Sequence, residues 1–230
     1  MARKLIPEPQ LTYVLELLTN LGPAADSFVL AGAQALKFLL PKARATRDFD
    51  FVLDVVVLRE ATIPIATILE KLGYVAIPGS QNFQFQKAIP DSTEIMRIEF
   101  MAPSEYKRKN DFRVDVQANV HAHACDGGQI ALAESELRDL SGRLPNRQNA
   151  AIKVRITLPH SLVLLKCLAM DDRYRNVRGS EHAEHDRSEA RTHVSSEVQP
   201  RSCRITSTSR KPVRFINICV TARFRDAFAS

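Results

Sequence analysis

The sequence contains no long apolar run, and no stretch approaches the roughly 18 consecutive apolar residues of a membrane-spanning helix. We therefore expect no membrane partner. The four cysteines lie far apart and form no Cys-x-x-Cys pair, which argues against a disulfide framework or a structural zinc site. This cysteine pattern predicts a reducing, cytoplasmic location. The opening residues, MARKLIPEPQ, include two prolines and a glutamate, so we expect no signal peptide.

The chain also lacks an even distribution of charge. The formal net charge is +6, and residues 198–230 contain seven basic residues and one acidic residue. Because this segment accounts for the whole excess, residues 1–197 are neutral overall. A basic balance usually suggests nucleic-acid binding, but here that suggestion applies only to the last segment. Rich in Arg, Ser and Thr and with little apolar periodicity, residues 198–230 are expected to form a basic, weakly ordered tail.

The chain has 230 residues, of which 45% are hydrophobic, and this predicts one large domain or a domain with a helical appendage. Apolar spacing predicts helices over 8–21, 33–40 and 63–73, and Pro41 is expected to end the second. From Leu158 the pattern turns helical again, and residues 180–198 form a polar, charged stretch. Alternation and β-branched or aromatic content predict strands over 27–32, 48–57, 74–77, 83–89, 94–102, 112–118 and 151–157.

These elements predict an α/β (α+β) fold, with a mixed β-sheet and flanking helices over residues 1–157 and C-terminal helices over residues 158–197. The order of elements does not by itself define a function. Function has to be argued from particular side chains.

Two aspartates, Asp48 and Asp50, lie two positions apart in RDFDFV, within the strand expected over 48–57. Residues i and i+2 of a strand point to the same face, so these carboxylates project together, about 7 Å apart along the backbone. Burying both is unfavourable unless a cation neutralises them. Hard oxygen ligands suit Mg²⁺ or Mn²⁺ rather than zinc. The alternative is two solvated acids at a strand end, paired with Arg44 and Arg47.

A glycine, Gly32, stands at a strand–helix junction in LAGAQAL, sixteen residues before Asp48. Such a turn lets backbone N–H groups approach a phosphate at a helix N-terminus, although it can also be only a tight turn. A third acid is expected on a neighbouring strand. We prefer Glu99, whose strand is the more apolar, and Asp115 is the competitor. Asp54 lies further along the strand of the pair and is expected at its end.

The stretch VLAGAQALKFLLPKARATRDFDFVL resembles the nucleotidyltransferase superfamily that includes DNA polymerase β, and is most similar to the AbiEii/AbiGii-type nucleotidyltransferase toxins. That family has a glycine turn, an Ala-Leu helix and then Arg-x-[Ser/Thr]-x-Asp-x-Asp. The later stretch LPHSLVLLKCLAMDDRYRN resembles the family's C-terminal helix, whose lysine and arginine face the nucleotide. The resemblance covers roughly residues 25–195. It departs at Ala33, where the family usually has a second glycine or small polar residue. The matching positions are Gly32, Ala35, Leu36, Arg44, Thr46, Asp48, Asp50, Lys166 and Arg173.

The resemblance implies a toxin-like enzyme that transfers NMP from an NTP to an RNA such as tRNA, or to a protein hydroxyl, with an antitoxin protein as a further partner. It implies that Mg²⁺ or Mn²⁺ is held by Asp48, Asp50 and Glu99, and that residues 158–197 complete the site. The alternative is a catalytically impaired nucleotide-binding protein or binding module of the same fold, which the departure at Ala33 favours. The implied nucleotide-binding residues are Gly32, Ala33, Arg44, Thr46, Lys166 and Arg173.

Other motifs have competing interpretations. The HAHAC stretch at 121–125 has spacing that a transition metal could use, although a polar strand end fits it better. Phe83 and Phe85 could stack on a base, but core packing is the simpler interpretation. The basic residues 107–109 could hold an RNA backbone or form a charged hairpin tip. A D-x-D phosphohydrolase of the haloacid dehalogenase type is disfavoured, because KARATR rather than an apolar strand precedes Asp48.

Overall fold

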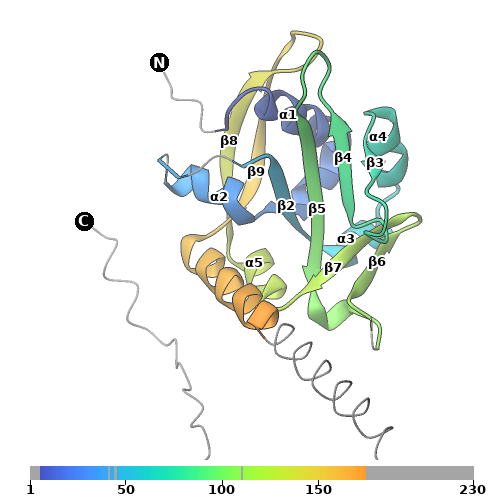
Figure 1. Cartoon of the computed structure of the whole chain (residues 1–230), viewed down its shortest axis with the longest axis vertical. Coiled ribbons are helices and arrows are strands. Elements are labelled where there is room, and N and C mark those ends of the chain that lie inside the picture. The colour runs from blue at the N-terminus through green and yellow to red at the C-terminus, as the bar shows by residue number, and fades with distance from the viewer. Residues whose placement is uncertain (1–5, 41, 44–45, 110, 175–230) are drawn as a thin grey trace, which may run out of the picture. The chain divides into compact units, whose positions relative to one another are not determined.

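The computed structural model describes residues 6–40, 42–43, 46–109 and 111–174 (Figure 1). All of them belong to one compact unit, Met1–Ala183. The second unit, Glu184–Ser230, lies outside the described residues, and so do Arg44, the whole polar stretch over 180–198 and the basic tail. No helix in the described part of the chain is long and apolar enough to cross a membrane.

Short helices and strands alternate along the described chain, and the strands join one nine-stranded mixed sheet. The predicted α+β fold is therefore confirmed. A further helix at 159–174 follows the last strand. The helices are α1 (Gln10–Leu21), α2 (Gly32–Leu39), α3 (Val55–Glu60), α4 (Ile65–Lys71) and α5 (Gly128–Ala133), with 3-10 turns η1 (Gly22–Ser27) and η2 (Ser104–Tyr106). The strands are β1 (Phe28–Leu30), β2 (Asp48–Leu53), β3 (Val75–Ala76), β4 (Gln84–Ala88), β5 (Ile95–Pro103), β6 (Arg113–Gln117), β7 (Val120–Cys125), β8 (Ser135–Arg143) and β9 (Asn149–Thr157).

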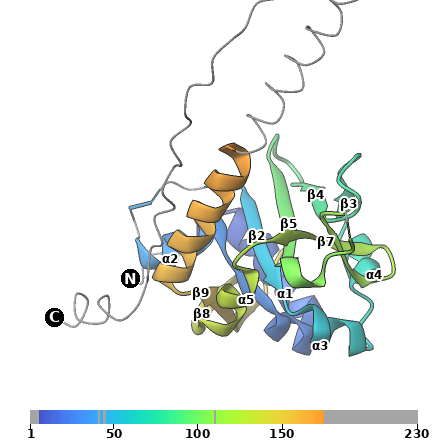
Figure 2. The ribbon, with the colours of Figure 1, turned by 90° about the horizontal axis from the view of Figure 1, so that it is seen from below.

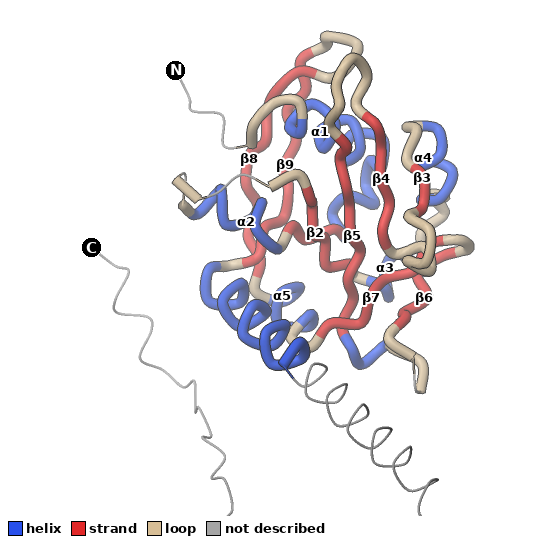
Figure 3. The backbone as a smooth tube through the Cα atoms, in the orientation of Figure 1, coloured by secondary structure: helices blue, strands red, loops and turns tan. Residues whose placement is uncertain are grey.

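The sheet has the strand order β3-β4-β5-β2-β1-β9-β8, and β7 joins β5 and carries β6 (Figure 3). Strand β2 runs parallel to β5 and antiparallel to β1, and β1 runs parallel to β9. One edge of β5 has two successive partners: β4 pairs with it as far as Glu99, and β7 pairs with it from Met101. This fork in the sheet lies directly beside the predicted third acid.

One face of the sheet is apolar. Successive residues of a strand point to opposite faces, and Phe49 and Phe51 of β2 share this face with Ile98 and Phe100 of β5. All four are buried, and Phe28 packs edge-on against Phe51 and Phe100 with ring centroids 5.8 and 5.6 Å apart. Buried residues of α1, α3 and α4 join the same core, among them Leu15, Leu58 and Ile65.

The opposite face is divided. A small apolar cluster joins Val29 and Val52 of the sheet to Ala131 and Leu132 of α5, and Leu165 packs against it from the helix at 159–174. The strands β2, β5 and β7 separate this helix, orange in Figure 2, from α3. Beyond the small cluster the face is polar. Its polar residues on β2, β4 and β5 are Asp48, Asp50, Gln84, Gln86, Arg97 and Glu99.

The strand predicted over 48–57 is too long. Strand β2 ends at Leu53, and Val55–Glu60 forms α3 although three β-branched valines begin it. The cause is Asp54, whose Oδ1 accepts a hydrogen bond from the Val57 N–H at 3.3 Å and caps the helix. Helix α5 and the edge strand β8 were not predicted, and the side chains of β8 are mostly exposed.

Candidate functional site

The two aspartates and Glu99 meet on the polar face of the sheet. Asp50 of β2 lies directly opposite Glu99 of β5 in the parallel pairing, and Asp48 lies opposite Arg97. Asp48 is exposed, whereas Asp50 and Glu99 are half-buried. The prediction that Asp48 and Asp50 share a face is confirmed, and Glu99 is the acid that the fold places next to them.

A cavity of about 370 Å³ opens at these carboxylates. This volume is within the range of small-molecule sites, roughly 300–1,000 Å³. Of the predicted residues, Gly32, Lys166 and Arg173 do not line it. The lining residues are Ala33, Thr46, Asp48, Asp50, Ile77, Gln84, Gln86, Arg97, Ile98 and Glu99.

Gly32 makes room for a carboxylate. Its φ is +63°, in the left-handed region that favours glycine, and a Cβ added there would lie 1.7 Å from Oδ2 of Asp50. The preceding Ala31 N–H donates to the Asp50 carbonyl oxygen at 2.8 Å, which fixes the turn against β2. The glycine therefore allows the carboxylate of Asp50 to reach the turn between β1 and α2, a contact that the sequence analysis did not foresee.

Helix α2 also holds the loop before β2. The fully buried Gln34 donates from Nε2 to the Thr46 carbonyl oxygen at 2.6 Å, and the Thr46 hydroxyl donates to the Asp48 carbonyl oxygen at 3.3 Å. Sequence reasoning missed Gln34, because a buried glutamine inside an apolar helix carries no motif. The predicted partner Arg47 instead forms an ion pair with Glu94 at 3.4 Å.

The electrostatics of the cavity centre on Asp50. The pKa of Asp50 is raised to about 6, mainly by burial and also by the nearby carboxylates of Glu99 and Asp48. The ammonium of Lys166 opposes them and lowers this pKa. Lys166 is thus close enough to act on Asp50 from its exposed position on the helix at 159–174. Arg173, also exposed, lies seven residues later and hence on the same side of that helix.

Glu99 is held by side chains that the motif analysis did not select. The Gln84 Nε2 donates to Glu99 Oε2 at 2.9 Å, and His123 Nδ1 lies 3.9 Å from Glu99 Oε1. Nothing in the local sequence brings β4 and β7 to the same acid. The fork in β5 does so.

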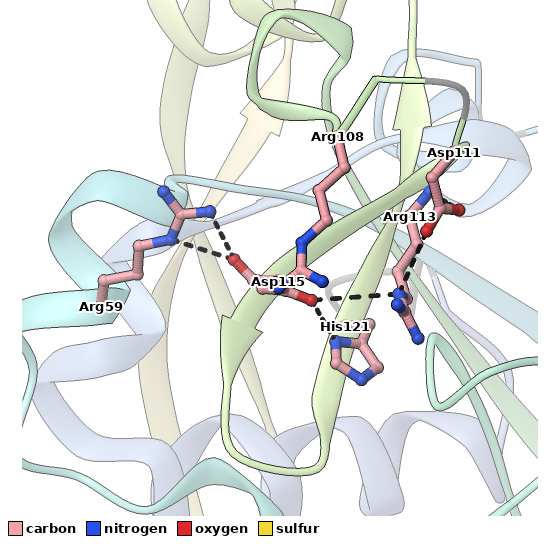
Figure 4. Close-up of polar contacts among 6 residues, drawn as sticks. All are labelled: Arg59, Arg108, Asp111, Arg113, Asp115 and His121. Atoms are coloured by element: carbon pink, nitrogen blue, oxygen red, sulfur yellow. Dashed lines mark hydrogen bonds and ion pairs between the residues drawn. The ribbon is translucent and has the colours of Figure 1, made fainter.

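Asp115, the competitor of Glu99, belongs to a different cluster (Figure 4). Its carboxylate pairs with Arg108, with His121 at 3.1 Å and with Arg113 at 3.9 Å. Arg59 donates to its carbonyl oxygen at 2.7 and 3.0 Å. Asp115 does not line the cavity. Surrounded by cations, it is a partner of arginines rather than a third acid beside Asp50.

The three carboxylates offer only oxygen donors, which suit a hard divalent cation. As the side chains lie, no group of three or more His, Cys, Asp or Glu residues in the described ranges is arranged to hold a metal ion. The histidines of the HAHAC stretch share a face of β7 but have separate partners, since His121 contacts Asp115 and His123 contacts Glu99.

Comparisons of the chain with protein-family models, with curated proteins and with solved structures found no match. The resemblance to the AbiEii/AbiGii-type toxins therefore stays a prediction that rests on the residues named above.

Proposed function

We propose that the chain is a Mg²⁺-dependent nucleotidyltransferase that transfers NMP from an NTP to an RNA or protein hydroxyl. One observation carries the proposal. Three carboxylates from two adjacent strands converge at a cavity of about 370 Å³. They lie beside a turn that requires glycine, because a Cβ at Gly32 would overlap the Asp50 carboxylate. A soluble protein gains no stability from gathering like charges in this way, so a cationic ligand is the simplest reason for the arrangement.

Asp48, Asp50 and Glu99 are the residues that would hold Mg²⁺ or Mn²⁺, and their donor chemistry fits these ions. The raised pKa of Asp50, about 6, supports the assignment because a bound cation would relieve the repulsion from Glu99 and Asp48. The support is the donor set and the strand register, not ligands already gathered around a centre. When bound, the divalent ion would stabilise charge on the phosphate oxygens and increase the acidity of the attacking hydroxyl.

The chain's own groups would position the reactants. Lys166 and Arg173, on one side of the helix at 159–174, offer cations to the triphosphate, and Ala33 lines the cavity. In the reaction the acceptor hydroxyl oxygen forms a bond to the α-phosphorus while the bond to the β-phosphate oxygen breaks, which releases pyrophosphate. Glu99, held at Oε2 by Gln84, has Oε1 to accept the hydroxyl proton. Thr46 completes the cavity wall next to Asp48.

A second candidate is a nucleotide-binding protein of the same fold without turnover. The observation that favours it is Ala33, which lines the cavity where the resembling family usually has a second glycine or a small polar residue. In this case the cavity would bind an NTP with Mg²⁺, but no NMP would be transferred to an acceptor. The toxin-like role, the antitoxin partner and the cytoplasmic location belong to either candidate and follow from the resemblance and the cysteine pattern alone.

The test incubates the purified full chain with each α-³²P-labelled NTP, Mg²⁺ and total cellular RNA. The variant Asp48→Asn, Asp50→Asn removes the central charges. The matched control is Asp115→Asn, which removes a carboxylate outside the cavity. We expect label in RNA or protein with wild type and Asp115→Asn, and at least a hundredfold less with the double variant, since each preorganised charge contributes a factor of roughly 10² or more.

Equilibrium binding of labelled NTP, with Mg²⁺ or with EDTA, separates the two candidates. Metal-dependent binding without transfer to any acceptor would support the second candidate. Neither binding nor transfer by a folded sample would overturn both.

A further inference from the structure

Three aromatic rings, Phe83, Phe112 and His123, gather beside Glu99, and we call them the aromatic platform. The Phe83 ring stacks on His123 with centroids 5.2 Å apart, and Phe112 stands edge-on to His123 at 5.4 Å and to Phe83 at 6.1 Å. Phe112 is 47% exposed and the His123 side chain is 40% exposed. By contrast, Phe85 is buried against Phe100 in the core. Core packing thus accounts for Phe85 but not for Phe83.

The aromatic platform lies next to Glu99, which lines the cavity, although its three rings do not line the cavity themselves. His123 Nδ1 lies 3.9 Å from Glu99 Oε1, and Gln84, the residue after Phe83, donates to Glu99 Oε2. In the sheet, His123 pairs with Met101, two residues beyond Glu99 on the same face of β5. A group stacked on the platform would therefore reach the acceptor side of the proposed reaction centre.

The backbone just before Phe83 is held in an unfavourable conformation. Gln81 and Asn82, directly before Phe83, have φ values of 49° and 61°, a left-handed region that non-glycine residues rarely adopt. Phe83 is fixed on both sides, because its N–H donates to Ser80 and its carbonyl oxygen accepts from Phe100. Such strain persists where the surrounding structure imposes it and is concentrated at functional positions.

A basic loop adjoins the platform in the chain. Lys107, Arg108 and Lys109 are exposed and precede Phe112 by three to five residues. The guanidinium of Arg108 is engaged with Asp115, so the exposed Lys107 and Lys109 are the cations of the loop that we assign to an external anion. Exposed aromatic faces next to basic side chains are the combination by which proteins bind single-stranded nucleic acid.

We propose that the aromatic platform stacks a base of a single-stranded RNA acceptor while Lys107 and Lys109 contact its phosphates. This placement brings a ribose hydroxyl of the RNA towards Glu99. The inference rests on the proposed function for its direction, but RNA binding at the platform can be tested without turnover. A duplex keeps its bases stacked on one another and so cannot use the platform.

The first measurement is fluorescence anisotropy of a 5′-fluorescein single-stranded RNA 12-mer, with the full chain in EDTA and without NTP. Replacing Phe112 by Ala should raise Kd by about 5- to 100-fold, the range for one lost base–aromatic stack. Phe112→Trp should keep Kd within about twofold, because it retains a stacking face. The matched control is Leu137→Ala, which removes an apolar side chain that is 56% exposed on β8, and its Kd should equal that of wild type.

The second measurement reads stacking directly. The chain has no tryptophan, so Phe112→Trp introduces its only indole fluorophore. Stacking on a base should quench this fluorescence with the single strand and not with a duplex of the same sequence. The seven basic residues of 198–230 attract RNA by charge alone, and quenching distinguishes the platform from that attraction.

The lysines have a separate signature. Replacing Lys107 and Lys109 by Ala should lower the slope of log Kd against log salt by about 1.4, because each phosphate contact on a single strand contributes roughly 0.7. At saturating RNA, the quenching of Phe112→Trp should be the same with and without the two lysine substitutions, since the base can still stack on the indole.

The outcomes separate this inference from the proposed function. If Phe112→Ala leaves Kd within twofold and Phe112→Trp is not quenched, the platform proposal is wrong even where label is transferred to RNA. Label transferred only to protein, with no RNA binding, would also overturn it. RNA binding and quenching that depend on Phe112, without transfer of label from any NTP, would support the platform and contradict the proposed transferase.

Discussion

The two faces of strands β2 and β5 differ in polarity, because alternate residues of the same segments are apolar on one face and acidic on the other. On one face Phe49, Phe51 and Phe100 are buried against helices, and on the other Asp50 and Glu99 repel each other at a cavity. Because a strand holds both sets rigidly, the apolar face provides the free energy that keeps the acidic face assembled. The side chains that stabilise the fold and the acids that line the cavity thus alternate one residue apart along the chain.

The largest effect should come from the apolar face. Phe100→Ala removes a fully buried ring that contacts Phe28 and Phe85 at centroid distances of 5.6 and 5.5 Å. We expect it to lower the free energy of unfolding by about 3–5 kcal/mol. Urea denaturation followed by circular dichroism measures this loss, with Arg97→Ala on the other face of β5 as a control that should change little. A loss below about 1.5 kcal/mol for Phe100→Ala would contradict the assignment of the two faces.

The next effect tests the contact between the glycine turn and the acid. Gly32→Ala should cost about 2–4 kcal/mol, because the left-handed φ is strained for alanine and the new Cβ meets the Asp50 carboxylate. The measurement is a double-mutant cycle with Asp50→Ala, which removes the two closest atoms. Part of the cost should disappear in the double variant. Simple additivity would mean that the backbone strain alone sets the cost.

A gain in stability is expected at the acidic face. The pKa of Asp50 is about 6 in the fold against 3.8 for an unperturbed carboxyl, so the folded state binds more protons and the wild type loses stability as pH rises between these values. Asp50→Asn should therefore raise the free energy of unfolding by about 1–3 kcal/mol at pH 7 in EDTA, and by nothing below about pH 4. Urea titrations from pH 4 to 7.5 measure how the gain in stability depends on pH. A gain that does not vary with pH would exclude the raised pKa of Asp50 as its cause.

The smallest effects should separate the two candidate third acids. Asp115→Asn breaks partly exposed ion pairs and should cost no more than about 1 kcal/mol, whereas Glu99→Gln should lower the pKa of Asp50 because Glu99 has the larger effect of the two repelling carboxylates. The pKa can be followed by the pH dependence of stability in each background. A lowered Asp50 pKa in Asp115→Asn and not in Glu99→Gln would reverse our choice of third acid.

Much of the sheet and the central pair of acids were predictable from local pattern. Alternation placed β4, β5, β6 and β9, and the parity of Asp48 and Asp50 put both on one face. The end of β2 was not predictable from strand propensity, because one cap at Asp54 outweighs three valines. Edge strand β8 was missed because its exposed side chains give no clear apolar alternation.

The rest of the site depends on long-range pairing. Preferring Glu99 to Asp115 from the sequence was a choice between two similar strands, and the register of β5 with β2 made the difference. The contribution of His123 arises where β7 takes over from β4 along β5, a junction that no local pattern specifies. Gln34 supports the loop before β2 through a hydrogen bond across 12 residues. A local sequence pattern indicates the secondary structure and the face of a residue, whereas these contacts depend on which strands become neighbours.

The pairing of β1 with β9 has a consequence for the order of events during synthesis. The Thr157 hydroxyl donates to the Leu30 carbonyl oxygen across 127 residues, so the turn at Gly32 gains its second neighbouring strand only when nearly all of the described chain has left the ribosome. Lys166 emerges later still. A nascent chain would thus expose its clustered acids before the lysine that offsets their repulsion arrives, so the repulsion at Asp50 would persist until Lys166 has emerged.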